Sequence, residues 1–152
     1  MVSEAKSPAQ LFALVVGAVL VAAGILGFFY EASFATGDDT LVERDAVLGI
    51  LDVNGWHNLV HLLSGAVGLA VVGSYAGARA YAFGLGAVYV VVTILGFAYG
   101  DGDSIFKLIP INTEDNVFHL LIAIAGIGAG LATPAQPAPT TATTTPPPAA
   151  AA

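Results

Sequence analysis

The sequence predicts an all-α membrane protein, a four-helix transmembrane bundle made of two parallel two-helix repeats, with a disordered C-terminal tail. Hydrophobic residues make up 57% of the 152 residues and charged residues 10%, against roughly 45–50% and about 25% in ordinary soluble domains. Four apolar stretches approach the roughly 20 residues that a helix needs to cross a bilayer. Two of these stretches match the other two in sequence.

We predict spans at about residues 10–30, 54–76, 79–100 and 115–133, within a membrane domain of residues 8–133. The first span carries no charge between Lys6 and Glu31. Little separates the second span from the third, so we expect a tight turn around Gly77 to Arg79. The remaining residues, 134–152, are only Pro, Ala, Thr and Gln. Such a segment lacks the large apolar side chains that folding requires, and we expect it to be disordered.

Two internal matches define the repeat. Residues 17–30 and 86–99, which are 69 positions apart, are identical at nine of fourteen places. The pattern Asn-x3-Asn-x2-His-Leu-Leu begins at Asn54 and again at Asn112. Because two helices return the chain to its starting side, the two units are expected to be parallel repeats.

The repeated pattern places polar residues at positions i, i+3, i+4 and i+7 of the second and fourth helices, which is one face of a helix. The residues of this stripe are Asn54, His57, Asn58 and His61 in the second helix and Asn112, Asp115, Asn116 and His119 in the fourth. With a rise of about 1.5 Å per residue, His61 and His119 lie a turn or so inside the membrane. Polar residues at such depth are candidates for function.

Three interpretations of this stripe remain open. In the structural one, which we favour from sequence alone, Asn54 and Asn112 cap helices, while Asn58, Asn116 and the histidines bond between helices. In the second, a metal such as zinc is bound by His57, His61, Asp115 and His119. In the third, His61 and His119 bind a cofactor, either a haem as its axial ligands or a quinone. The sequence requires no cofactor.

Several classes of function are disfavoured. The chain has no cysteine, which excludes disulfides and Cys-ligated metals, and its net charge of -7 makes a nucleic-acid partner improbable. No catalytic triad, phosphate loop or pair of carboxylates within a span is present, so we assign no catalytic residue and favour a non-enzymatic structural or binding component. A small transporter is a further alternative. The acidity also suggests a halophilic source.

We expect the protein to lie in the cell membrane as a multi-pass protein, with both termini on the same side. The four basic residues divide evenly between the two sides, and the cytoplasmic placement of the termini rests on Lys6 and Arg79, which are close to span ends. The expected partner is the lipid bilayer, together with a second copy of the chain or another membrane protein.

The elements NLVHLL at residues 58–63 and NVFHLL at residues 116–121, with the ILGF segments at 25–28 and 94–97, resemble a known family. It is a family of small four-span integral membrane proteins classed as a domain of unknown function. The resemblance covers about residues 8–133 and implies the same four-helix fold. It carries no activity or catalytic residue.

Overall fold

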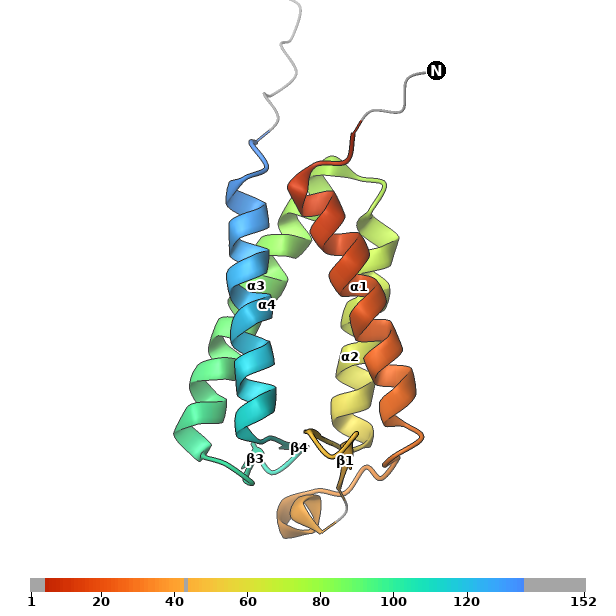
Figure 1. The fold of residues 1–152 in the computed structure, drawn as a ribbon, viewed down its shortest axis with the longest axis vertical. Helices are drawn as coiled ribbons and strands as arrows, with labels where there is room; N and C mark the ends of the chain where they lie inside the picture. The colour runs from red at the N-terminus through yellow and green to blue at the C-terminus, as the bar shows by residue number, and fades with distance from the viewer. Residues whose placement is uncertain (1–4, 43, 136–152) are drawn as a thin grey trace, which may run out of the picture.

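The computed structural model describes residues 5–42 and 44–135, and it confirms the predicted all-α four-helix bundle (Figure 1). The predicted disordered tail falls almost entirely on residues 136–152, outside the described residues. The helices are α1 (Pro8–Gly27), α2 (Gly55–Val71), α3 (Tyr75–Tyr99) and α4 (Thr113–Leu131). Between α1 and α2 lie a 3-10 helix, η1 (Gly37–Leu41), and the strands β1 (Asp45–Val47) and β2 (Leu51–Val53); between α3 and α4 lie β3 (Ser104–Ile105) and β4 (Ile109–Pro110).

Side-chain caps decide where α1 and α3 begin. The Ser7 hydroxyl accepts a hydrogen bond from the first turn of α1, and the Ser74 hydroxyl accepts one from the backbone N–H of Gly77. Such caps satisfy backbone donors that lack a partner within the helix. Because Ser74 starts α3, the turn after α2 lies at residues 72–74. The positions from Gly77 to Arg79, where the sequence predicted the turn, are helical.

The four helices form two antiparallel pairs, α1 with α2 and α3 with α4 (Figure 1). The two pairs meet at the end where α1 begins and separate toward the end that carries the short strands. Alanine, leucine and aromatic side chains form the buried core of the bundle, which contains Ala9, Phe12, Ala13, Leu20, Ala78, Ala82, Leu85, Tyr89 and Ala123. The first turn of α1 also meets the residues after α4, since the Ala9 N–H donates to the Thr133 hydroxyl at 2.9 Å.

The surface of the bundle is apolar, as expected for a protein in lipid. Of the described helices, α1, α3 and α4 are long and apolar enough to cross a membrane, whereas α2 is 17 residues long. Large apolar side chains such as Val15, Ile94 and Ile124 are about 60% exposed (59%, 62% and 61%). In water such a surface would promote association, so the chain is a membrane protein.

Glycines allow the two helices of each pair to approach closely. A Cβ atom on Gly65 of α2 would lie 2.6 Å from the carbonyl oxygen of Gly17 in α1, and one on Gly126 of α4 would lie 2.8 Å from the carbonyl oxygen of Ala82 in α3. Helices in lipid associate through such close packing of small residues, because lipid gives them no hydrophobic drive to associate.

A contact between an asparagine and a glycine occurs once in each helix pair. The side-chain oxygen of Asn58 occupies the place where a Cβ on Gly27 would stand, and Asn116 has the same relation to Gly96. The Asn58 amide also donates to the backbone carbonyl of Glu31 at 2.7 Å, just beyond α1. Each asparagine therefore requires glycine on the neighbouring helix.

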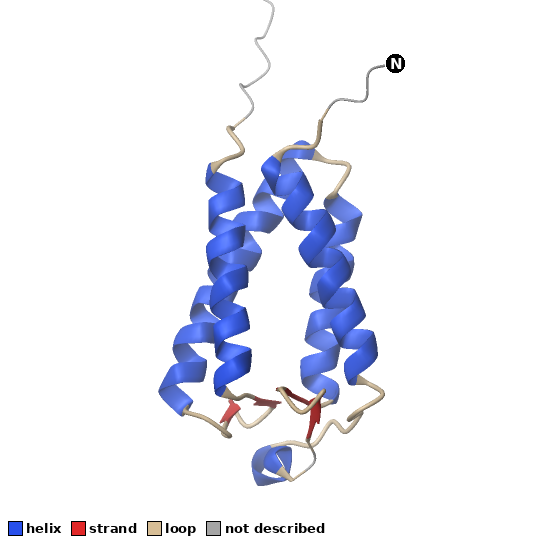
Figure 2. Cartoon of the chain, viewed as in Figure 1, coloured by secondary structure: helices blue, strands red, loops and turns tan. Residues whose placement is uncertain are grey.

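Figure 2 shows the short strands at the wide end of the bundle, where an asparagine of each helix pair binds the hairpin of the other pair. The Asn54 side chain caps α2 through the His57 N–H and donates to the Leu108 carbonyl of the β3–β4 hairpin at 2.7 Å. The Asn112 side chain caps α4 through the Asp115 N–H and donates to the Ile50 carbonyl of the β1–β2 hairpin at 2.6 Å. These two reciprocal hydrogen bonds fix the first turns of α2 and α4 relative to each other.

We predict that Gly27→Ala and Gly96→Ala each destabilise the protein by about 1–3 kcal/mol, because the new methyl group displaces the asparagine side chain from a packed interface. Gly84→Ala and Gly128→Ala are the controls, since a Cβ at either helical position meets nothing within 4 Å. Those controls should be neutral or up to about 1 kcal/mol stabilising through helix propensity. Thermal unfolding in detergent measures the difference. Equal unfolding temperatures for Gly27→Ala and Gly84→Ala would show that the asparagine contact is not required.

Candidate metal centre

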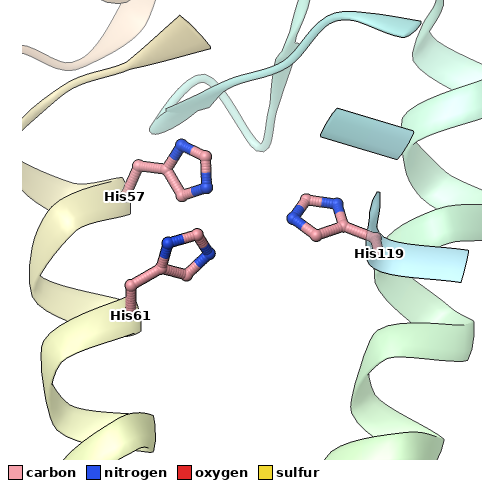
Figure 3. A group of neighbouring side chains, drawn as sticks. All are labelled: His57, His61 and His119. Carbon is pink, nitrogen blue, oxygen red and sulfur yellow. The ribbon is translucent and has the colours of Figure 1, made fainter. Parts of the chain in front are cut away.

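Three histidines from two helices point toward one another near the wide end of the bundle (Figure 3). His57 and His61 lie one turn apart on α2, and His119 lies on α4. Their ring centroids are separated by 4.4 Å (His57 to His61), 6.1 Å (His57 to His119) and 6.3 Å (His61 to His119). One nitrogen from each ring can be chosen so that the three lie within 4.8 Å of one another. The arrangement resembles a ligand set assembled around a single point.

Two of these imidazoles are buried, the third, His61, is half-buried, and the rings make few hydrogen bonds. His57 is 3% exposed and His119 is 4% exposed. Within the described residues, Nε2 of His57 and Nδ1 of His119 are buried without any hydrogen-bond partner. A buried polar atom without a partner costs about 1–3 kcal/mol, and such atoms in native proteins call for an explanation such as an ion or ligand.

The protonation of His57 follows from its one hydrogen bond. Its Nδ1 atom lies 2.8 Å from the backbone carbonyl oxygen of Asp52. A carbonyl oxygen only accepts, so Nδ1 carries the proton and donates. In the neutral ring this leaves a lone pair on Nε2, the atom without a partner. Histidines that bind metals are commonly oriented by a second-shell bond of this kind.

Asp115, the carboxylate that the sequence placed in the same ligand set, binds elsewhere. Its Oδ2 atom accepts from the backbone N–H of Asp52 at 3.0 Å and from that of Asn112 at 3.3 Å. The group of described side chains that can share one ion consists of the three histidines alone. Asp115 instead fixes β2 to the start of α4, and through Asp52 it supports the orientation of His57.

The carboxyl group of Asp52 contributes separately. It forms an ion pair with Arg44 at 2.7 Å, and both side chains are partly buried. Burial raises the pKa of this carboxyl group, and the positive charge of Arg44 opposes that rise. The ion pair closes the loop before β1 against β2, the strand whose backbone holds both His57 and Asp115.

The other predicted residues lie beside this cluster rather than in it. Asn54 and Asn112 cap the helices, and Asn58 and Asn116 contact the glycines of α1 and α3. His61 and His119, the predicted cofactor ligands, are 6.3 Å apart at 84°, and His57 lies near both rings. A flat porphyrin between His61 and His119 would have to share that space with the His57 ring.

Two features of the site escaped the sequence analysis. A cavity of about 460 Å³ adjoins the histidines, lined otherwise by apolar and aromatic side chains of α2, α3 and the β3–β4 hairpin. Tyr89 of α3 lines this cavity, and its ring centroid is 5.1 Å from that of His119. The sequence did mark Tyr89, because the alignment of residues 17–30 with 86–99 places a tyrosine at position 89 opposite Leu20.

We predict that Asp115→Ala destabilises the protein by about 2 kcal/mol, because two backbone N–H groups lose their acceptor. Asp115→Asn should retain most of the stability, since its amide oxygen still accepts. Glu114→Ala is the matched control, an exposed acidic residue one position earlier in the same helical turn. The measurement is the unfolding temperature in detergent. If Glu114→Ala costs as much as Asp115→Ala, helix-terminal charge rather than the bonds to Asp52 and Asn112 explains the effect.

Comparisons with known proteins give one match. The family model described as Domain of unknown function (DUF4383) matches residues 10–132, which include all three histidines and most of the four helices. No curated protein and no solved structure matches the chain. The matched region begins within α1 and ends just after α4. The chain therefore belongs to the DUF4383 family of domains of unknown function.

Proposed function

We propose that this chain is a metal-binding membrane protein whose three histidines hold one divalent transition-metal ion, with zinc as the first candidate. The observation that carries the proposal is the cluster of three imidazoles with ligand atoms within 4.8 Å and no hydrogen bonds from His57 Nε2 or His119 Nδ1 in the described part of the chain. Imidazole nitrogen is a preferred ligand of zinc, copper, iron and nickel.

The geometry needs only small adjustments to bind an ion. Zn–N bonds of about 2.0–2.1 Å in a tetrahedral site place the nitrogens about 3.4 Å apart. The histidine ligand atoms lie within 4.8 Å, so each separation needs to shorten by at most about 1.4 Å. Side-chain rotation supplies movements of this size. The His57 ring is already held by Asp52 with the lone pair on Nε2 available.

The structural interpretation explains less. Interhelical hydrogen bonding would require donors or acceptors on other helices facing these rings. Among the described residues, the only hydrogen bond made by the three rings joins His57 to Asp52, in the strand just before the same helix. Haem ligation by His61 and His119 is also less favoured, because the third imidazole lies beside them.

The proposed ion would join the two halves of the protein. We propose that α2 crosses the membrane with the three longer helices, and that the two helix pairs are copies of one unit. Equivalent contacts support the repeat: Asn58 with Gly27 and Asn116 with Gly96, and the exchanged bonds of Asn54 and Asn112. The meeting of α1 and Thr133 supports termini on one side of the membrane, which we assign to the cytoplasm. His61 and His119 are equivalent in the repeat, and His57 is the added third ligand.

We predict that the detergent-purified protein binds one Zn²⁺ per chain and that Zn²⁺ raises its unfolding temperature, since an ion that binds only the folded state stabilises it. His57→Ala, His61→Ala and His119→Ala should each weaken Zn²⁺ binding by more than the roughly 10–100-fold that loss of an outer-shell partner costs. Elemental analysis measures the number of Zn²⁺ ions per chain, and calorimetric titration measures the Zn²⁺ affinity. Thermal unfolding with and without Zn²⁺ measures the change in unfolding temperature.

Asp115→Asn is the matched control, because it alters the one predicted ligand that lies outside the cluster. Its Zn²⁺ affinity should stay close to that of the unmodified protein. Unfolding in the presence of a chelator shows whether each histidine variant is folded without metal. The proposal fails if the folded protein shows no saturable Zn²⁺ binding, or if the histidine variants bind Zn²⁺ as the unmodified protein does.

A further inference from the structure

The cavity beside the histidines has the character of a ligand site. Its volume of about 460 Å³ falls in the range of small-molecule pockets, roughly 300–1,000 Å³. The three imidazoles lie along one part of its wall, and the rest is apolar or aromatic, with Val92, Tyr89 and Phe106 among the lining residues. An ion held by three histidines keeps a fourth coordination position, and the cavity is the space next to it.

Part of the cavity opens between apolar helix faces, which meet lipid in a protein that crosses a membrane. Val60 of α2 and Val88 and Val91 of α3 line it and are themselves 49%, 56% and 55% exposed. These residues lie on helix faces that an ordinary soluble protein would bury. A ligand that enters between them therefore comes from the hydrocarbon of the bilayer and is itself soluble there.

Charge restricts the ligand further. Three neutral imidazoles leave the full charge of a divalent ion in apolar surroundings, which is costly unless an anion joins it. A carboxylic acid ionises in water at about pH 4, so at neutral pH a fatty acid is charged and has to take up a proton before it enters apolar surroundings. A phenol crosses lipid as a neutral molecule, and in water its hydroxyl ionises at about pH 10. A divalent metal promotes that ionisation, as it does for bound water.

We propose that this cavity binds a lipid-soluble phenol of the hydroquinone class, with its hydroxyl oxygen in the fourth position of the metal. The inference rests on the proposed metal site. Binding exchanges one anion for another: the metal–oxygen bond to hydroxide breaks, the bond to the phenol oxygen forms, and the phenol proton leaves with the hydroxide as water. The aromatic ring then packs against Tyr89 and Phe106, and its apolar substituent leaves between Val60 and Val88.

The test uses Co²⁺ as the probe, because its visible absorption reports the ligands of a tetrahedral site. The protein in lipid nanodiscs is loaded with Co²⁺ and titrated, without oxygen, with a decyl-substituted hydroquinone. We expect a saturable change in the Co²⁺ bands. The dimethyl ether of the same hydroquinone should cause none, since it has no proton to lose.

Two variants block the cavity without touching a histidine. Val92→Phe fills its interior and Val88→Phe fills its rim. Each should retain Co²⁺ binding and weaken the hydroquinone response at least about tenfold, a change of about 1.4 kcal/mol. Val15→Phe, on an exposed face of α1 outside the cavity, is the control and should respond like the unmodified protein.

The outcomes separate this inference from the metal site. Co²⁺ binding with no response to hydroquinone overturns the inference and leaves the metal site standing. A response to oleate but not to hydroquinone also overturns it, in favour of a fatty acid. A phenolate band that is present before any ligand is added and is lost in Tyr89→Phe would show that the Tyr89 oxygen occupies the fourth position of the metal. That outcome too would overturn the inference. If Co²⁺ does not bind, both proposals fall.

Discussion

The exchange of hydrogen bonds between Asn54 and Asn112 holds the wide end of the bundle together. Each side chain starts one helix with its oxygen and binds the hairpin of the other half with its nitrogen. Replacement of either asparagine would remove two bonds at once, the cap of one helix and the link to the opposite hairpin. The two helix starts are thereby fixed in relation to each other. The position of His119 opposite His57 and His61 depends on this constraint, because α2 and α4 have no packed core between them at that end.

The matching segments of the sequence differ at three positions near the site. His61 corresponds to His119, whereas His57 corresponds to Asp115 and Tyr89 corresponds to Leu20. His57 and Asp115 both bind the backbone of Asp52, the first through its carbonyl and the second through its N–H. If both halves carried aspartate at this position, as the second half does, only two imidazoles would be present. The histidine at position 57 supplies a third imidazole. The aspartate at the matching position, 115, supplies the acceptor that binds β2.

Sequence patterns predicted the four helices, the caps and the facing of two polar stripes, because each depends on local spacing. They did not separate Asp115 from the histidines, since the i, i+4 rule places a carboxylate and an imidazole on one face without showing which backbone amides the carboxylate will bind. The cavity could not be predicted from the sequence either, because it depends on how far the two helix pairs separate in space. Tyr89 sits in an apolar run, where a tyrosine more often marks packing. The turn before α3 was misplaced because the cap at Ser74 acts before the charged residue at Arg79.

The narrow end of the bundle joins the two helix pairs. There the first turn of α1 is bonded to Thr133, and Arg79 donates to the Thr133 carbonyl at 2.7 Å, so both pairs are joined close to one point. A helix of 20 residues such as α1 is about 30 Å long, and a rotation of about 3° at one end moves the other by about 1.5 Å. A displacement of this size is comparable to the shift of about 1.4 Å that side-chain rotation supplies at the histidines. A tilt of one pair against the other would therefore change the distances from His119 to the two histidines of α2, and it would leave the distance between His57 and His61 unchanged.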